Sequence, residues 1–528
     1  MSRTGIVCDP DMKSASISRR DIPTLASLVS RSRSERRRTP SLVDVTPTRS
    51  QRDAITCDPS RSLLVLGEAG HGKTTVLVLR VARLVAAARG RLRAAVVVPT
   101  EGLVRLLEPL LRRAGADVEV ATYDRWASAQ ARHAFRFLPR ESELTPANVM
   151  RLKRHPALRI ALAELATREP GRVDDDHDAP QARSRRRRVS RGDLQHLFGD
   201  RTLMAEVQRA GSLPWTCVED VLERTRVQLG PSAEREHAHV NDASRLRAVD
   251  GRSLDDGTAT AHADTVDVED YAVLFELDRL RAAARGTPAL PPRLFDLIAI
   301  DEAQEFAPIE LALLGRSLAP GGTLIVSGDA DQQTDDTTTF AGWDNVMHEL
   351  RPAALETVKL EIGHRCPPQV EALARALRDG RLPSASSFAP PPNMVRGAPT
   401  VLRQFPDEEA LCGELGREVE LVLRRDRRTS LAVLCRSPLV VRRLVGRFRR
   451  TVPMRLVFDG KFLPRGVVQA STIDEVKGLE FDYVIVPDAN AATYPDDPPS
   501  RRALYIAITR ARHQLILAHV GTTSPLLR

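Results

Sequence analysis

Long apolar runs are scarce in this 528-residue sequence. None approaches the ~18 consecutive apolar residues that a membrane-spanning helix needs, so we expect no membrane partner. The N-terminus also lacks the apolar core of a secretory signal peptide, and Asp9, Asp11 and Asp21 argue against an organelle transit peptide. The length suggests about two to four domains, and a hydrophobic content of 42% is ordinary for a globular protein, which we expect to be cytoplasmic because its scattered cysteines fit a reducing compartment.

Cysteines, aromatic residues and lysines are few as well. The six cysteines are scattered without a C-x-x-C pair, which predicts neither a disulfide framework nor a zinc site. Aromatic residues make up 4% of the chain, so it has few of the rings on which single-stranded nucleic acids stack. Arginine supplies nearly all of the 78 basic residues, so a position that keeps lysine, such as Lys73 or Lys477, is expected to need a compact ammonium group.

The excess of arginine gives the chain a net charge of +9. This charge favours a polyanionic partner such as nucleic acid, although basic surfaces are often only solvated. Residues 1–45 are rich in Ser, Arg and Pro and show no sustained periodicity. They predict a disordered basic arm, which either tethers nucleic acid or is a solvated tail.

Residues 63–85 contain the most specific motif of the chain. The apolar run 63–66 predicts a buried strand, and apolar residues at helical spacing from position 76 predict a helix. Between them lies Gly67-Glu68-Ala69-Gly70-His71-Gly72-Lys73-Thr74, a G-x4-G-K-T phosphate loop in its usual strand–helix context. Lys73 is expected to reach the β- and γ-phosphates, and Thr74 to bind Mg2+. The predicted nucleotide-binding residues here are Gly67, Gly70, Gly72, Lys73, Thr74 and Thr75.

Two later strands deliver carboxylates and amides. Residues 294–300 predict a strand that ends at Asp301 and Glu302. Asp301 is expected to hold Mg2+ with Thr74, and Glu302 to orient the attacking water, with an acidic cap at a strand end as the alternative. Residues 323–326 predict the next strand, after which Gln332 is placed to sense the γ-phosphate. An acidic run in the same segment is unusual for a surface that meets nucleic acid; it comprises Asp329, Asp331, Asp335 and Asp336.

The remaining pattern is also α/β. Strands predicted at 94–98 and 118–121 end at Thr100 and Thr122, at the sheet edge where such folds bind ligands. The α/β pattern covers 46–128 and 291–350, and residues 129–290 predict a mostly helical insertion with disordered loops and helices at 147–167 and 194–228. A second α/β domain is predicted over 351–528, with strands at 356–360, 399–404, 430–435, 454–457, 467–471, 482–487 and 514–518.

Together these segments resemble the ordered motifs of UvrD/Rep-like superfamily 1 helicases. The stretches GEAGHGKTT, IDEAQ, GDADQQ, EVKGLEFDYVIV and LYIAITRAR carry the resemblance, which runs from Gln51 to about residue 517 apart from the insertion. It implies an α/β fold of two RecA-like P-loop domains with parallel sheets, ATP and Mg2+ in the cleft between them, and single-stranded or partly duplex DNA as the partner.

The resemblance also implies roles for single residues. Gln51 would contact adenine, His364 would stack on it and Glu480 would meet the ribose. Gln304 and Gln332 would link the γ-phosphate to the strand-binding surface, while Arg365 and Arg510 would act as arginine fingers from the second domain. Trp126 and Trp343 are candidate stacking platforms, with a core position as the alternative for each. The nucleic-acid contacts implied are Thr100, Thr122, Trp126, Thr472 and Lys477.

Several departures from the family keep the function open. The family usually has Tyr where His364 stands and an aromatic residue just after Gln332, and the stretch from Arg365 to Thr472 is too short for the large second-domain insertion. The EVKGLEFD block also resembles the HelD-like branch, which acts on RNA polymerase. We expect an ATP-dependent DNA translocase or helicase, with 3′→5′ polarity implied by the resemblance and DNA repair as the expected process. One alternative is a HelD-like or defence- or nuclease-associated ATPase that remodels a protein–nucleic acid complex without processive unwinding, with RNA polymerase, a nuclease or a repair complex as its partner. The other is a nucleotide-gated binding scaffold.

Overall fold

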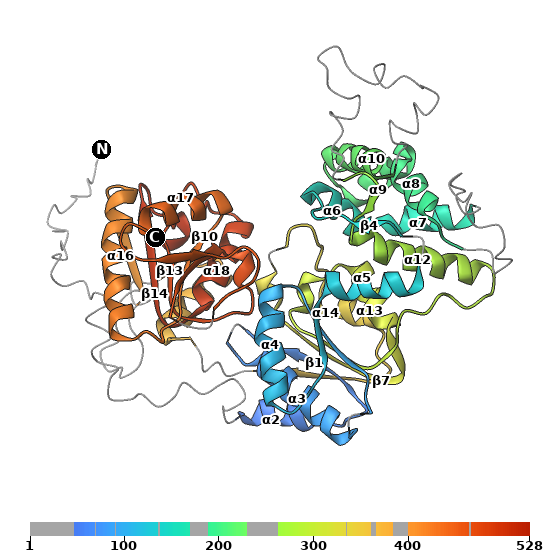
Figure 1. The fold of residues 1–528 in the computed structure, drawn as a ribbon, viewed down its shortest axis with the longest axis horizontal. Helices are drawn as coiled ribbons and strands as arrows, with labels where there is room; N and C mark the ends of the chain where they lie inside the picture. The colour runs from blue at the N-terminus through green and yellow to red at the C-terminus, as the bar shows by residue number, and fades with distance from the viewer. Residues whose placement is uncertain are drawn as a thin grey trace, which may run out of the picture.

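The computed structural model describes residues 47–528 except Ala69, Gly90, 136–137, 169–187, 230–261, Thr334, 361–365, 384–399 and 464–465. The arm predicted at 1–45 lies outside the described residues. Two six-stranded parallel sheets form two lobes, and a helical insertion stands on the first of them (Figure 1). The α/β class with parallel sheets is therefore confirmed.

The first lobe is built on the sheet order β3-β2-β6-β7-β1-β8. Its strands β1, β2 and β6 are buried on both faces, which explains why they read as nearly continuous apolar runs, while the edge strands β3 and β8 are only partly buried. Leu77 and Leu103 from α3 and α4 cover one face, while Trp126 and Leu314 from α5 and α13 cover the other. The strands are β1 (Ser62–Leu66), β2 (Ala94–Val98), β3 (Glu119–Thr122), β6 (Phe295–Ile300), β7 (Leu318–Gly328) and β8 (Leu355–Lys359). The helices are α2 (Arg49–Thr56), α3 (Lys73–Ala87), α4 (Glu101–Arg113), α5 (Tyr123–Ala134), α13 (Pro308–Arg316) and α14 (Trp343–Leu350).

One strand lies in a different sheet from the one predicted. The strand expected at 356–360 was assigned to the second domain, but β8 pairs in parallel with β1, with Leu64 opposite Thr357. The assignment of this strand to 351–528 is therefore wrong. An apolar pattern identifies a buried strand, but only tertiary pairing decides which open sheet edge the strand completes.

The second lobe has the strand order β11-β12-β10-β13-β14-β9, and all neighbours are parallel. Helices α16 and α17 cover one face of this sheet, and α15 and α18 cover the other. The strands are β9 (Val401–Phe405), β10 (Leu431–Cys435), β11 (Met454–Leu456), β12 (Val468–Thr472), β13 (Phe481–Val486) and β14 (Ala511–Val520). The helices are α15 (Pro368–Arg378), α16 (Glu408–Arg425), α17 (Pro438–Phe448) and α18 (Pro498–Thr509).

The helical insertion lies between α5 and β6 and rests on the first lobe, where α12 contacts α5 and α13. The helices predicted at 147–167 and 194–228 are present, but each is interrupted by short turns. A two-stranded parallel sheet pairs β4 (Arg140–Glu141), near the start of the insertion, with β5 (Thr265–Val266), which comes just before its last helix. The helices are α6 (Ala147–Arg154), α7 (Leu158–Thr167), α8 (Arg191–Gly199), α9 (Arg201–Gly211), α10 (Trp215–Leu229) and α12 (Glu269–Ala284). In the described parts of the chain, every helix is too short or too polar to cross a membrane.

A buried charge cluster holds the insertion together. Lys153 of α6 is 2% exposed, and its ammonium lies 2.6 Å from Asp270 Oδ1 and 2.9 Å from Asp267 Oδ2. Burial alone would lower the pKa of Lys153, but Asp270 and Asp267 outweigh it and hold that pKa above its ordinary value. Arg224 of α10 pairs with Asp267 as well, at 2.8 Å. The cluster therefore joins α6 and α10 to the start of α12.

We predict that Lys153→Met lowers the free energy of unfolding by about 3–5 kcal/mol, because it removes one partner of a buried ion pair and leaves carboxylates buried with too little positive charge. Urea unfolding followed by circular dichroism measures the change. Arg226→Met is the control, since Arg226 pairs with Glu223 on the surface, and it should leave the urea midpoint unchanged. An unchanged midpoint for Lys153→Met would contradict the account of the cluster.

Candidate active site

The phosphate loop joins β1 to α3 in the predicted order. Gly70 and Gly72 have φ angles of 80° and 86°, in the left-handed region that favours glycine. Gly72 is the N-cap of α3, so the helix begins at Lys73. The Lys73 ammonium donates hydrogen bonds to the carbonyls of Gly67 (2.7 Å) and Glu68 (3.2 Å). The loop thus places a cation and the positive end of a helix at one point, which suits a polyphosphate.

The side chains of His71 and Gln51 hold this loop in place through hydrogen bonds. His71 Nδ1 lies 2.7 Å from the carbonyl oxygen of Leu360, just after β8, so it must carry the proton to donate. Gln51 Nε2 donates to the His71 carbonyl (2.8 Å), and Gln51 Oε1 accepts from the Thr48 N–H in the capping box of α2 (2.9 Å). Both ends of the Gln51 amide are therefore already partnered. Its predicted contact with adenine stays a prediction, for which the amide still has a second N–H and a second oxygen lone pair.

The two residues predicted to bind metal are in direct contact. Thr74 Oγ donates to Asp301 Oδ2 at 2.9 Å, and Ser327 Oγ donates to Asp301 Oδ1 at 2.6 Å. Asp301 is fully buried, and burial is the main cause that raises its pKa to about 6, with a further rise from Glu302. A hydroxyl and a carboxylate are the oxygen donors that Mg2+ prefers, usually completed by phosphate oxygens and water. The residues present therefore fit that ion.

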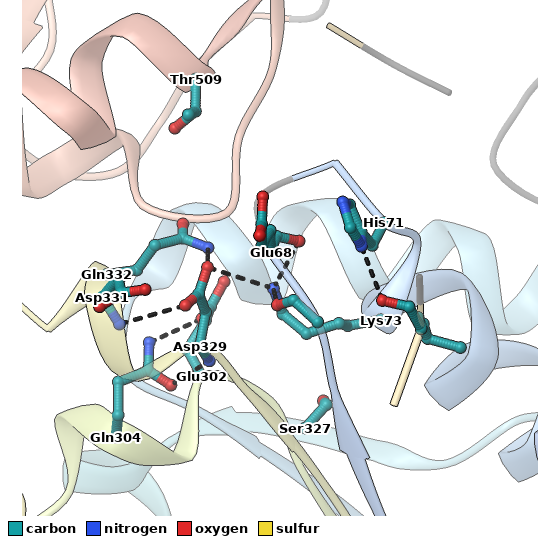
Figure 2. A network of polar contacts seen from close by, with 12 residues as sticks. Glu68, His71, Lys73, Glu302, Gln304, Ser327, Asp329, Asp331, Gln332 and Thr509 are labelled. Carbon is teal, nitrogen blue, oxygen red and sulfur yellow. Dashed lines mark hydrogen bonds and ion pairs between the residues drawn. The ribbon is translucent and has the colours of Figure 1, made fainter. Parts of the chain in front are cut away.

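Glu302 has an unusual backbone conformation. Its φ and ψ angles are 54° and 47°, a left-handed conformation that costs a non-glycine residue roughly 1–2 kcal/mol. Glu302 Oε2 accepts a hydrogen bond from Gln304 Nε2 at 2.8 Å, and Gln304 Oε1 accepts from the Asp329 N–H at 3.1 Å. The turn thus directs the carboxylate of Glu302 toward the Lys73 side of the site, where Figure 2 shows it beside Asp329. Strain of this kind is characteristic of functional sites.

A chain of polar contacts leads from the phosphate loop to the second lobe. The Lys73 ammonium lies 3.9 Å from Asp329 Oδ2, and the same oxygen accepts from Gln332 Nε2 at 2.8 Å (Figure 2). Gln332 Oε1 in turn accepts from Arg510 Nη2 at 2.5 Å. Arg510 follows α18 in the second lobe and is buried. Asp329 and Gln332 therefore link Lys73 in the first lobe to Arg510 in the second through consecutive polar contacts.

Asp329 is a residue that the sequence interpretation left without a role. Tyr505 of α18 also approaches its carboxylate, at 3.4 Å, so two residues from the second lobe converge on this segment. The acidic run around Asp329 is now explained by cationic partners. Asp329 lies beside Lys73, and the other ion pairs are Asp331 with Arg378 (4.0 Å), Asp335 with Arg154 (2.6 Å) and Asp336 with Arg151 (2.7 Å). The acidic run is visible along the chain, but its partners are not, because they come from distant segments.

Four other predicted nucleotide residues have different outcomes. His364 and Arg365 lie outside the described residues. Thr75 is buried in the first turn of α3. Glu480 lies just before β13 in the second lobe, with Arg512 Nε 3.7 Å from its carboxylate. The structure therefore brings Gly67, Gly70, Gly72, Lys73, Thr74, Asp301, Glu302, Gln332 and Arg510 into one connected site, while a contact from Glu480 to the ribose stays a prediction.

The two lobes meet at a backbone contact beside α4. A Cβ atom on Gly460 would lie 2.7 Å from the backbone N of Gly102, and one on Gly478 would lie 2.3 Å from Leu103 Cδ2. Gly460 and Gly478 belong to the second lobe and also have positive φ angles. Side chains are therefore excluded on the second-lobe side of this contact, which lets the two backbones approach closely.

A groove of about 640 Å3 opens next to this contact, and three residues predicted to bind nucleic acid line it. Thr100 and Thr122 cap the N-termini of α4 and α5 there, and Lys477 faces them from the second lobe. Thr472, the fourth candidate, is buried at the end of β12 and is not part of the lining.

The charge of this groove is opposite to the charge of the whole chain. Lys477 is not free in it, because its ammonium lies 3.0 Å from Glu305 Oε2. Phe458 supplies an aromatic ring to the lining, with Arg442 over that ring at 5.0 Å; the sequence interpretation missed this pair. Two lining residues are basic, Arg125 and Lys477, and seven are acidic, Glu101, Asp124, Asp335, Asp336, Asp459, Asp474 and Glu475. Such a lining disfavours a phosphate backbone.

Trp126 does not lie where a base could stack on it. Its side chain is 0% exposed and packs beside Tyr123, at 5.9 Å between ring centroids, within the core of the first lobe. The predicted nucleic-acid contact of Trp126 is therefore wrong, and the core alternative is correct. Helical spacing cannot tell a ring that faces the sheet from one that faces a ligand. Trp343 is partly buried and packs edge-on against Phe340, at 5.1 Å.

Comparison with known proteins agrees with this geometry. A family model described as an AAA domain matches residues 51–337, more than half of the chain. A second model, described as a UvrD-like helicase C-terminal domain, matches residues 468–518. Among curated proteins, none matches this chain. Among solved structures, the C-terminal domain of a possible DNA helicase from Lactobacillus plantarum WCFS1 is 24% identical, with 31% of this chain and 92% of that chain covered and a TM-score of 0.25.

We predict that Trp126→Ala lowers the free energy of unfolding by about 3–5 kcal/mol, because it leaves a large cavity in the core. The milder Trp126→Phe should keep the chain folded and leave its affinity for a fluorescent oligothymidine unchanged. Trp215→Ala serves as the control for stability, since Trp215 is 40% exposed on α10. A selective loss of oligothymidine binding by folded Trp126→Phe would restore the stacking role.

Proposed function

This chain belongs to the UvrD-like helicase family, and from that premise we propose that it is an ATP-driven motor that hydrolyses ATP between its two lobes and moves along DNA. The observation that carries the proposal is the chain of contacts from Lys73 through Asp329 and Gln332 to Arg510. A guanidinium supplied from the second lobe stabilises transition-state charge only when the lobes are together. Turnover would therefore depend on the relative position of the lobes.

The residues have separate tasks in this proposal. Lys73 and the backbone of the phosphate loop hold the phosphates, and Thr74 and Asp301 hold Mg2+, which neutralises charge on the phosphate oxygens when bound. Glu302 positions and polarises the attacking water, with Gln304 holding its carboxylate. Gln332 links the γ-phosphate to Arg510. By family resemblance, His364, Arg365 and Glu480 complete the site around the base, phosphates and ribose.

A cycle of opening and closing supports movement along a strand. The cavity between the phosphate loop and the second lobe is about 20 Å3, enough for about one water molecule. Its lining includes Glu68 and His71 of the first lobe and Tyr505 and Thr509 of the second. In the proposed cycle the lobes part to admit a triphosphate and close around it, since Arg510 comes from the second lobe. Thr100, Thr122 and Lys477 would contact the strand in the groove beside this site, with 3′→5′ movement by family resemblance.

A second function is favoured by the charge of that groove. Seven carboxylates disfavour a phosphate backbone and favour a cationic protein segment. The chain would then be an ATPase that remodels a protein–nucleic acid complex, with RNA polymerase, a nuclease or a repair assembly as the partner class, and without processive unwinding. The same ATP site would serve both functions.

The two functions differ in what stimulates hydrolysis. ATP turnover is measured with single-stranded DNA, duplex DNA, RNA or no nucleic acid, each over a range of salt concentrations. For the motor, we expect single-stranded DNA to accelerate turnover and salt to reduce the effect steeply, because phosphate contacts release counterions. A basal rate that no nucleic acid changes would reject the motor and favour the remodelling ATPase.

We predict that Arg510→Ala retains ATP binding but lowers turnover by roughly 10^3-fold, because an arginine finger acts on the transition state. Lys73→Ala should instead lose nucleotide binding itself. A fluorescent ATP analogue reports binding and phosphate release reports turnover. Arg502→Ala, at an exposed position of α18, is the matched control and should behave as wild type. If Arg510→Ala hydrolysed ATP at the normal rate, hydrolysis between the lobes would be excluded.

A further inference from the structure

Arg154 occupies a junction that the nucleotide site does not explain. It is the last residue of α6 in the helical insertion, and its side chain is 7% exposed. Its guanidinium reaches out of the insertion to three separate segments of the first lobe. Nη1 donates to Asp335 Oδ2 (2.6 Å) and Thr337 Oγ (2.7 Å), and Nη2 donates to the Glu305 carbonyl (3.2 Å) and Glu310 Oε2 (3.0 Å).

These contacts use the particular shape of the arginine side chain. Nε also lies 2.9 Å from Glu310 Oε1, so one edge of the planar group faces Glu310 and the other faces Asp335 and Thr337. A lysine ammonium is a point charge and cannot bridge the same groups at once. The chain uses arginine widely, but at this position the forked geometry itself is needed.

The contacted segments directly follow two positions of the nucleotide site. Glu305 comes three residues after Glu302, and Asp335 comes three residues after Gln332. Glu305 Oε2 also accepts from the Asp335 N–H, at 3.2 Å, so the two segments are joined to each other as well. A shift of one segment relative to the other would break several buried, charge-assisted hydrogen bonds, which are individually strong.

The same junction reaches the groove and the second lobe. Asp335 and Asp336 line the groove, and Arg151, one turn before Arg154 on α6, pairs with Asp336 at 2.7 Å. Lys477, across the groove in the second lobe, pairs with Glu305 at 3.0 Å. The insertion, the first lobe and the second lobe therefore meet around Arg154 and Glu305.

We propose that Arg154 is a positioning residue that couples occupancy of the groove to the nucleotide site, an inference that rests on the proposed function. A strand in the groove must displace Lys477 from Glu305 or shift the segment 335–337. Arg154 transmits that shift to the segments that follow Glu302 and Gln332 in the chain. Because Arg154 belongs to α6, the same contacts also transmit a shift to that helix. The insertion thereby acts as part of the ATPase and not only as an attachment to it.

A second arginine offers a matched control. Arg159 of α7 also ties the insertion to the first lobe, through two hydrogen bonds of 2.7 Å to Glu349 of α14. Glu349 is not adjacent to the segments behind Glu302 or Gln332. Arg154→Lys and Arg159→Lys therefore weaken attachments of the same chemistry, only one of which reaches the segments that follow Glu302 and Gln332.

The test uses the full chain and measures ATP turnover with and without oligothymidine. We expect Arg154→Lys to reduce the stimulation ratio at least about fivefold, the lower end of usual coupling factors, with little change in KM for ATP. Arg159→Lys should keep the wild-type ratio. Asp335→Asn changes the other, less buried partner of the contact with Arg154. The double variant Arg154→Lys/Asp335→Asn should reduce the stimulation ratio no more than the stronger of the two single variants. If oligothymidine stimulates wild type, equal ratios in wild type, Arg154→Lys and Asp335→Asn would overturn the proposal.

A second measurement separates this proposal from the proposed motor. Hydrogen exchange of the peptide 147–154 is compared with and without a non-hydrolysable ATP analogue. We expect the analogue to change exchange of this peptide in wild type and in Arg159→Lys, and not in Arg154→Lys. If oligothymidine fails to stimulate wild type but this pattern holds, the motor is rejected and the coupling stands. If the analogue leaves α6 unchanged in wild type, the coupling is rejected.

Discussion

The contact between Gln332 and Arg510 is the interaction on which the rest of the structure depends. It is the point where the second lobe reaches the segment that also holds Asp329 beside Lys73. Without it, the first lobe has a phosphate loop, a buried contact between Thr74 and Asp301 and a positioned carboxylate, but among the described residues it would lack the guanidinium that Arg510 supplies from the second lobe. The close backbone approach at Gly460 and Gly478 allows the lobes to come near enough for this contact.

The charge of the groove is opposite to the charge of the whole chain. The chain as a whole is basic, yet the groove between the lobes is lined mainly by carboxylates. Several of those carboxylates are committed to ion pairs, such as Asp335 with Arg154 and Asp336 with Arg151. The acidic lining is therefore partly the outer side of a network that holds the insertion against the segments that follow Glu302 and Gln332. Net charge alone would have suggested a basic track there.

Most of the fold could be predicted because its signals are local. Nearly continuous apolar runs identified the buried parallel strands, and the phosphate loop was recognisable from a strand, a glycine-rich turn and a helix in order. The prediction for Trp126 was wrong because helical spacing shows that a ring lies on an apolar face, not what that face contacts. The placement of β8 was wrong because strand pairing is a non-local choice between two sheets.

The sequence by itself determined the chemistry available at the site: which residues can grip phosphate, bind Mg2+, polarise water and supply guanidinium groups. Those properties belong to side chains and short motifs, and they persist wherever the motif folds. Only the tertiary structure decided which of these groups meet, because Lys73 and Arg510 are far apart along the chain and approach only through the packing of two lobes. It alone also gave Asp329, Arg154 and Glu305 their partners, since an ion pair between distant segments leaves no pattern along the chain.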